Sequence, residues 1–130
     1  MDYNTLLKLA QEAKYRAYAP YSGFRVGAAL LTSSGKVYTG CNVECASYAA
    51  TSCAERTAIV KAVSEGELSF KAIAIASDAK GCTFPCGICR QVIVEFGEDI
   101  DIIVGTGETD LQVFNVRELL PNAFTKTNIE

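Results

Sequence analysis

The chain has 130 residues, 49% of them apolar and 21% charged, and is long enough to fold as one domain over residues 1–130 without disulfides. Its formal net charge is -3 and its sequence pI is near 5.0, an acidic balance that opposes binding to a nucleic-acid polymer, because counterion release needs a basic surface. It contains no histidine, which excludes Ser/His and Cys/His nucleophile pairs and every histidine-based metal site.

The first expected elements are a helix and a two-stranded hairpin. Residues 4–18 are predicted to form a helix capped by Asn4. Its apolar residues recur at helical spacing along one face: Leu6, Leu9, Ala10, Ala13 and Ala17. Strands are expected over residues 24–32 and 36–43, and the tight turn at 33–35 makes them antiparallel neighbours.

The second half of the chain alternates helices and strands. Helices are expected over residues 52–65, 86–96 and 117–120, and strands over 71–77, 100–105 and 111–116. A short polar turn joins the last two strands, which predicts that strands four and five are antiparallel. The alternation predicts an α/β layered domain with a mixed five-stranded sheet.

Two short stretches carry metal-ligand chemistry: Cys-Ala-Glu-Arg at residues 53–56 and Pro-Cys-Gly-Ile-Cys-Arg-Gln at residues 85–91. Cys86 and Cys89 are three apart, so on a helix they share one face and can bind one ion. Cys53 and Glu55 are two apart and converge only at a helix start, which places Cys53 in the opening turn. At both helix starts the positive end of the helix dipole favours a thiolate.

Three sulfurs leave a tetrahedral Zn²⁺ one ligand short, which is typical of a catalytic zinc. Glu55 beside such a site suggests a water that the metal makes nucleophilic and that the glutamate deprotonates. Arg56 is the cation expected to hydrogen-bond the sulfurs. We therefore predict a zinc hydrolase with one zinc ion per subunit.

A structural zinc is the alternative, with a fourth sulfur from Cys41, Cys45 or Cys82. The chain would then be a zinc-stapled interaction module. Glu55 next to a ligand, and a Pro-Cys-x-x-Cys that opens a helix, favour the catalytic site. A thioredoxin-like redox use of Cys-x-x-Cys leaves Glu55 unexplained.

The N-terminus and the thiols predict the compartment. Residues 1–16 lack the apolar core of a signal peptide, and no apolar stretch is long enough to span a bilayer. These features predict a cytoplasmic protein with reduced thiols and no membrane partner. A secreted protein with three disulfides among its six cysteines is the alternative.

The two metal motifs resemble those of zinc nucleobase deaminases, which carry a His or Cys ligand, any residue, Glu, and then Pro-Cys-x-x-Cys. With three cysteines and no histidine, the chain looks like the small homotetrameric cytidine deaminases. The match covers nearly the whole chain. It includes Tyr-Ala-Pro-Tyr-Ser at 18–22, Phe-Arg-Val-Gly-Ala-Ala at 24–29, Cys-Asn-Val-Glu at 41–44 and Leu-Leu-Pro-Asn-Ala-Phe at 119–124.

This resemblance implies a three-layer α/β/α fold and the deamination of free cytidine and 2'-deoxycytidine by a zinc-activated water, as in pyrimidine salvage. Cys53, Cys86 and Cys89 would ligate zinc. Glu55 would move protons from the water to N3 of cytosine and to the leaving ammonia.

The resemblance also implies substrate-binding residues and an oligomer. Phe24 would pack on the base, Asn42 and Glu44 would bind the ribose hydroxyls, and the Ala54 amide would meet the pyrimidine carbonyl. Residues reaching the pocket from neighbouring subunits of a homotetramer would be Ala46, Tyr48 and Phe124.

Each of these residues also has an ordinary interpretation from its type alone. Phe24 opens an apolar strand and could belong to the core, and Phe124 could anchor the tail. Asn42 could cap a turn, and Glu44 could be a solvated surface carboxylate. Cys45 follows Glu44 where the family commonly has Asn, and Cys82 is an additional thiol.

Three other functions compete with cytidine deamination. Deamination of blasticidin S uses the same zinc chemistry, but those enzymes lack the glutamate that Glu44 supplies here. A polynucleotide editor is disfavoured by the acidic balance and by the absence of a basic, aromatic-rich surface. The third is the zinc-stapled module described above.

Overall fold

Five strands form one mixed sheet in the computed structural model of the protein, which describes residues 1–106 and 110–130. The strands are β1 (Val26–Thr32), β2 (Val37–Cys41), β3 (Phe70–Ser77), β4 (Asp101–Val104) and β5 (Gln112–Asn115). Their order across the sheet is β2-β1-β3-β4-β5, with β3 and β4 parallel and the other pairs antiparallel. The predicted hairpin and the antiparallel pairing of strands four and five are confirmed. The polar turn expected between them includes residues 107–109, outside the described residues.

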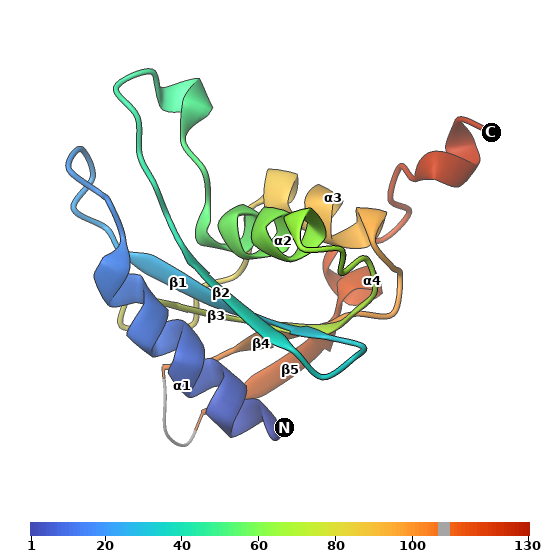
Figure 1. Ribbon diagram of the computed structural model, residues 1–130, viewed down its shortest axis with the longest axis horizontal. Helices are drawn as coiled ribbons and strands as arrows, with labels where there is room; N and C mark the ends of the chain where they lie inside the picture. Colours follow the sequence, from blue (N-terminus) through green and yellow to red (C-terminus); the bar gives the residue numbers. More distant parts are fainter. Residues whose placement is uncertain (107–109) are drawn as a thin grey trace.

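Helices cover both faces of this sheet, as the three-layer prediction requires (Figure 1). The helix α1 (Tyr3–Ala13) packs on one face against β1 and β3. The opposite face carries α2 (Ala54–Ser64), α3 (Gly87–Glu95) and the short α4 (Val116–Leu119). Short 3₁₀ helices span Lys14–Arg16, Tyr48–Ala50 and Lys126–Asn128. Two apolar cores result, one on each side of the sheet.

The first helix begins and ends earlier than its sequence pattern predicts. Its N-cap is Asp2, whose Oδ1 accepts a hydrogen bond from the Thr5 amide at 2.8 Å, so the prediction that Asn4 caps it is wrong. The α-helical part stops at Ala13, and a 3₁₀ turn follows. Asp and Asn cap helices about equally well, so residue type alone does not distinguish these two start points.

The strand expected from residue 24 begins at Val26, which leaves Phe24 in the loop before the sheet. The side chain of Phe24 is 40% exposed, so it does not belong to the core. None of the helices in the described ranges has the length and hydropathy needed to cross a membrane. All six cysteines lie in the described ranges, and all are free thiols.

The helix α2 lies unusually close to the sheet because small residues face each other across the contact. Ala54, Ala58 and Ala62 are fully buried along one side of the helix. Opposite them, Gly40 in β2 has no side chain, and a Cβ built there would lie 2.5 Å from the Ala58 nitrogen. The same Cβ would lie 2.6 Å from the Ala54 oxygen. Backbone atoms on both sides make this contact rigid, and it fixes the height of α2 above the sheet.

We expect Gly40→Ala to destabilise the protein by about 1–3 kcal/mol, because the new methyl group overlaps backbone atoms that cannot rotate away. Chemical denaturation at one fixed protein concentration measures this change. The matched control is Gly81→Ala, since a Cβ at Gly81 meets nothing within 4 Å. Equal unfolding free energies for the two variants would contradict the rigid contact.

Candidate metal centre

Two helix N-termini bring the sulfurs of the predicted cluster together. Cys53 is the N-cap of α2 and Cys86 the N-cap of α3, each with an extended backbone. Neither side chain hydrogen-bonds the backbone of its own helix start. Cys89 lies one turn into α3 and is buried. The expectation that Cys53 occupies the opening of its helix is confirmed.

The Sγ atoms of Cys53, Cys86 and Cys89 all lie within 4.8 Å of one another. Tetrahedral zinc at about 2.3 Å from each sulfur would hold them roughly 3.8 Å apart, a spacing that falls within this range. Three thiols are soft donors, which suit zinc and do not suit magnesium or calcium. The donor set therefore fits zinc and supplies one ligand fewer than a tetrahedral ion takes.

Two of the three remaining thiols have hydrogen-bond partners elsewhere. The Cys45 thiol points to the Ala50 oxygen at 3.7 Å, and the Cys82 sulfur accepts from Gln112 Nε2 at 3.7 Å. Among the described residues neither belongs to the metal-ligand group, and Cys41 does not either. The structure thus offers no fourth sulfur for a closed structural zinc within the described ranges.

Arg56 lies against the cluster, as predicted. Its NH2 group donates to Cys53 Sγ at 3.3 Å and to the Thr51 oxygen at 3.1 Å. Its Nε is buried and has no hydrogen-bond partner among the described residues. A hydrogen bond from the Cys89 thiol, together with Arg56, lowers the pKa of Cys53 to about 5. The same hydrogen bond and burial raise the pKa of Cys89.

Glu55 lies on the first turn of α2, two residues after Cys53, and is only 5% exposed. Burial, reinforced by the negative charge of Cys53, raises the pKa of its carboxyl to about 7. Hydrogen bonds from its own amide and from Cys89 act in the opposite direction. A carboxyl in this environment exchanges a proton readily near neutral pH, as a general acid–base must.

Glu55, Cys53 and Cys86 line a cavity of about 210 Å³, and the buried Cys89 lies behind it. Its walls come from the end of the sheet where β1 begins and β2 ends, the start of α2 and the loop before α3: Val26, Asn42, Thr51, Cys53, Ala54, Glu55, Thr83, Phe84 and Cys86. A second cavity of about 400 Å³ is lined by Tyr21, Ser22, Glu44, Tyr48 and Thr51. Thr51 lines both, so the two hollows adjoin. The smaller one alone is below the roughly 300–1,000 Å³ typical of small-molecule pockets.

The structure separates the predicted substrate-binding residues into two groups. Asn42 and Ala54 line the metal-side cavity, and Glu44 and Tyr48 line the adjoining one. Phe24 stands beside this site, because its carbonyl oxygen accepts from Asn42 Nδ2 at 2.8 Å.

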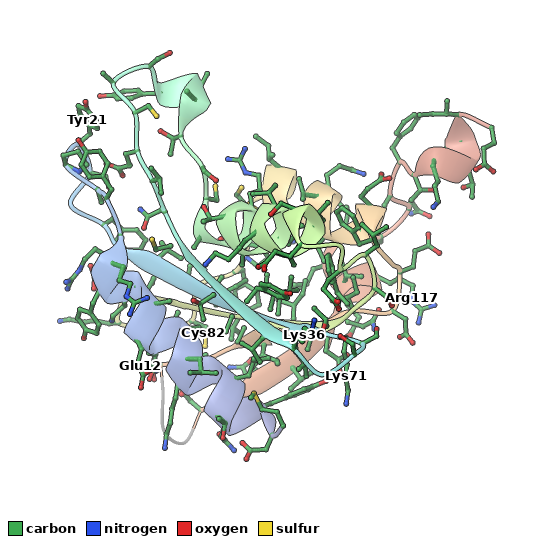
Figure 2. The ribbon with its side chains drawn as sticks, viewed as in Figure 1. Glu12, Tyr21, Lys36, Lys71, Cys82 and Arg117 are labelled. Atoms are coloured by element: carbon green, nitrogen blue, oxygen red, sulfur yellow. The ribbon has the colours of Figure 1, made fainter. Side chains whose placement is uncertain are left out.

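Ala46 and Phe124 are not brought to either cavity. Both side chains are exposed, and Phe124 lies in the C-terminal segment, tied to α3 by a hydrogen bond from Gln91 Nε2 to its carbonyl oxygen. Tyr48 is 75% exposed and meets Tyr21 edge-on, with ring centroids 6.2 Å apart. Figure 2 shows Tyr21 at the outer end of the loop before β1, beside the long loop between β2 and α2 that carries the 3₁₀ helix Tyr48–Ala50.

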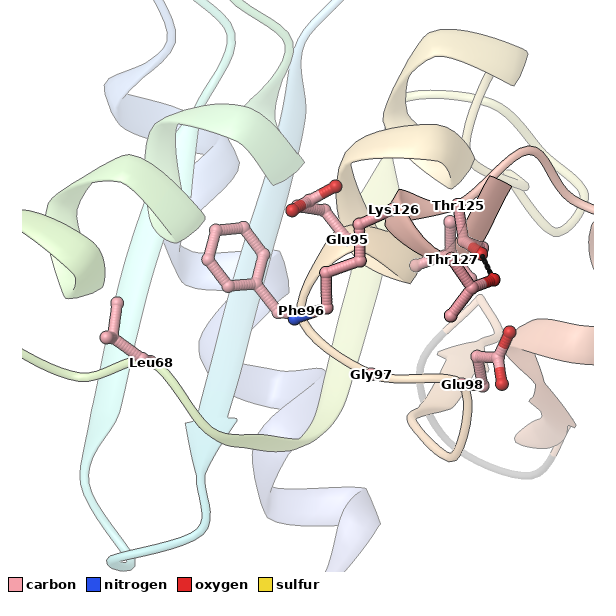
Figure 3. Close-up of a pocket in the computed structure, with 9 residues that line it drawn as sticks. Leu68, Glu95, Phe96, Gly97, Glu98, Thr125, Lys126 and Thr127 are labelled. Atoms are coloured by element: carbon pink, nitrogen blue, oxygen red, sulfur yellow. Dashed lines mark hydrogen bonds between the residues drawn. The ribbon is translucent and has the colours of Figure 1, made fainter. Parts of the chain in front are cut away.

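A separate groove lies between the end of α3 and the C-terminal segment (Figure 3). It has a volume of about 420 Å³ and is lined by Leu68, Val94, Glu95, Phe96, Gly97, Glu98, Thr125, Lys126 and Thr127. The metal ligands, Glu55 and the predicted substrate-binding residues take no part in its lining. Among the residues drawn, the two threonines hydrogen-bond each other at 2.8 Å.

Three polar residues that the sequence interpretation left without a role support the site. Arg90 donates to the Pro85 oxygen at 2.8 Å and to the Leu119 oxygen at 2.7 Å, which ties the turn before Cys86 to the end of α4. Ser22 and Thr51 line the cavities. Arg90 and Ser22 belong to stretches already singled out, but no spacing rule reveals partners that far away in the chain.

Comparison with known proteins agrees with this geometry. The family model described as "Cytidine and deoxycytidylate deaminase zinc-binding region" matches residues 1–106. A cytidine deaminase of Sporosarcina psychrophila is 46% identical over 130 residues, covering 99% of this chain and 96% of the relative. A cytidine deaminase of Halalkalibacterium halodurans is 50% identical over 126 residues, with 96% of each chain covered. The crystal structure of cytidine deaminase from Burkholderia pseudomallei superposes with a TM-score of 0.90 at 45% identity, covering 95% of this chain and 100% of that one.

We expect Cys86→Ser to lose most of its bound zinc, because a hydroxyl replaces one of only three thiolate ligands. Zinc content per chain, measured by inductively coupled plasma mass spectrometry, reports the loss. Cys45→Ser and Cys82→Ser are the matched controls and should retain about one zinc per chain. Loss of zinc from either control would show that its sulfur is a ligand after all.

We expect Arg56→Ala to lower kcat/KM or zinc affinity by about 10–100-fold, the effect typical of removing a group that hydrogen-bonds a metal ligand. The free energy of unfolding should fall much less. Arg56→Lys keeps the positive charge but not the planar fork of donors. Its kcat/KM and zinc affinity should therefore lie between those of the wild type and Arg56→Ala. Proportionate losses of stability and activity would contradict this role for Arg56.

Proposed function

The chain belongs to the cytidine and deoxycytidylate deaminase family, and we propose that it hydrolyses free cytidine and 2'-deoxycytidine to uridine and 2'-deoxyuridine with release of ammonia. Such a reaction serves pyrimidine salvage. The observation that carries the proposal is the buried Glu55 in one cavity with Cys53 and Cys86, two sulfurs of the three-thiol cluster.

We assign the zinc ligands as Cys53, Cys86 and Cys89. When bound there, zinc acts as a Lewis acid that makes a water nucleophilic at neutral pH. Glu55 takes one proton from the attacking water and delivers it to N3 of the cytosine ring. It then takes the second proton, from the new hydroxyl at C4, and delivers it to the departing amino group, so that ammonia leaves and the C4 carbonyl of uridine remains. Burial of this carboxyl keeps both protonation states accessible. Arg56 offsets the negative charge of the thiolates.

The two adjoining cavities support one orientation of the nucleoside. The pyrimidine ring lies on the metal side, where the Ala54 amide, a free donor of the first helical turn, meets the carbonyl at C2. Phe24 packs on the base. The ribose points toward the larger hollow, where Asn42 at the junction and Glu44 bind its hydroxyls.

We further propose a homotetramer in which neighbouring subunits complete each site through Ala46, Tyr48 and Phe124. The exposure of Tyr48 and of Phe124, at 75% and 62%, supports this, because large exposed aromatic side chains are typical of contact surfaces. The small volume of the metal-side cavity is a second support, since a subunit at its mouth would deepen it. The proposed unit is one catalytic domain, residues 1–130, in the reduced cytoplasm, with no polynucleotide or membrane partner.

Relatives named cytidine deaminase, similar over nearly their whole length, favour cytidine over blasticidin S as the substrate. A zinc-stapled interaction module does not account for a buried glutamate in the cavity beside the metal ligands. Cytidine turnover by the wild type tests the blasticidin S alternative, and a mutation of Glu55 tests the interaction module, because only an enzyme needs the proton-carrying group.

We expect the wild-type protein to deaminate cytidine and Glu55→Gln to retain zinc while losing turnover by about 10²–10⁴-fold or more, because the amide cannot accept the proton. The fall in absorbance as cytidine becomes uridine measures turnover. Glu65→Gln, an exposed change at the C-terminal end of the same helix, is the control and should remain active. Full activity of Glu55→Gln, or inactivity of the wild type toward cytidine, would refute the proposal.

A further inference from the structure

The carboxylate of Glu44 is held by a turn that lies more than twenty residues earlier in the chain. Its Oε1 accepts hydrogen bonds from the amides of Tyr21 and Ser22, each at 3.0 Å. Its Oε2 accepts one from the Ser22 hydroxyl. The hydroxyl, followed by the amides, lowers the pKa of Glu44, so the group stays ionised at neutral pH.

The same hydroxyl also binds the residue that stands over the base site. Ser22 Oγ lies 3.0 Å from the Phe24 amide nitrogen and accepts its hydrogen. A serine hydroxyl has one hydrogen to donate, and since the Phe24 amide can only donate, that hydrogen goes to Glu44. The carbonyl of Phe24 is bound in turn by Asn42 Nδ2. Both peptide groups of Phe24 are therefore fixed by side chains.

The backbone of this turn depends on Gly23. Its φ of 69° lies in the left-handed region, which glycine adopts without steric cost. Its amide donates to the Ala19 oxygen at 2.9 Å and closes the turn. Folding of the loop alone thus presents the Ser22 hydroxyl between Glu44 and Phe24, before any ligand arrives.

The hydrogen bonds also limit what Glu44 can still accept. An ionised carboxylate has about four acceptor sites, two on each oxygen. The two amides use both sites of Oε1, and the Ser22 hydroxyl uses one site of Oε2. One acceptor site is left, on Oε2, in a direction set by Ser22. The carboxylate can therefore receive a single hydroxyl group of a ligand.

We propose that Ser22 is a positioning residue that governs recognition of the sugar. Its hydroxyl orients the free acceptor of Glu44 toward one ribose hydroxyl, and it also holds the backbone of Phe24 in place beside the base. This inference rests on the proposed function. The hydroxyl acts through Glu44 and Phe24 and need not touch the substrate.

The test compares Ser22→Ala with Ser22→Thr, which keeps a hydroxyl on the same carbon. Removing a hydrogen bond to a charged group typically weakens binding by about 10-fold or more. We expect Ser22→Ala to raise KM for cytidine and the Kd for uridine, measured by calorimetry, by roughly that factor, with kcat within about three-fold of wild type. Ser22→Thr should restore both values. The change should shrink for 2',3'-dideoxycytidine, which keeps its 5'-hydroxyl but lacks the 2'- and 3'-hydroxyls that Glu44 would bind.

Ser34→Ala is the matched control, since the Ser34 hydroxyl also donates to a carboxylate, Glu67 Oε1 at 2.6 Å, at the far end of β1. It should leave KM and Kd unchanged. In a Glu44→Ala background, Ser22→Ala should cause a smaller loss than it causes alone, because coupled residues are not additive. If Ser22→Ala fails to fold, Ser22→Cys provides the same comparison with a weaker donor of similar size.

Three results would overturn the inference: an unchanged KM in Ser22→Ala, an equal rise in KM for the dideoxynucleoside, or full additivity with Glu44→Ala. Each requires a wild-type protein that deaminates cytidine. A wild type that does not turn over cytidine refutes the proposed function itself, so the two failures are distinguishable.

Discussion

The site depends on two helices that begin at the same end of the sheet, with N-termini close enough to bring their sulfurs together. The register shows why they meet. Gly27 in β1 pairs with Cys41 in β2, and Val26 pairs with Ser77 in β3, so β1 begins where β2 and β3 end, at the same end of the sheet. The chain leaves that end of the sheet twice and enters a helix each time, at Cys53 and at Cys86. Because helix N-termini stabilise negative charge, three thiols can gather there as metal ligands without a histidine.

Close packing makes this convergence precise enough for metal binding. Fully buried alanines on α2 rest on Gly40, and the backbone atoms at that contact have no freedom to shift. The parallel pair β3 and β4 requires a crossover, and α3 provides it on the same face as α2. Arg90 then links the turn before Cys86 to the end of α4. The sulfurs are thus positioned by the fold itself, and the loops around them supply the walls of the cavity.

The sequence predicted the metal centre better than its surroundings, and the reason is physical. Cysteines three apart on a helix, and a cysteine two residues before a glutamate, restrict local geometry so strongly that only helix starts satisfy them. Substrate-side features depend on contacts between distant segments. The partners of Glu44 lie in the loop before β1, and the partners of Asn42 are backbone atoms of Phe24 and Val26. No periodicity encodes such pairs. Phe24 was ambiguous for the same reason: an aromatic residue before an apolar strand resembles core until the strand boundary is known.

Two glutamates in the neighbouring cavities have opposite environments, and these environments suit them to different tasks. Glu55 is buried among sulfurs, where its charged form is costly and its pKa rises. Glu44 is surrounded by three donors from one turn, which favour its charged form and lower its pKa. A carboxyl of the first kind can carry a proton, and a carboxyl of the second kind remains an acceptor throughout a reaction. In the proposed reaction the same amino acid thus serves once as a proton carrier and once as a permanent hydrogen-bond acceptor, and the neighbours that each glutamate meets in the fold suit it to its role.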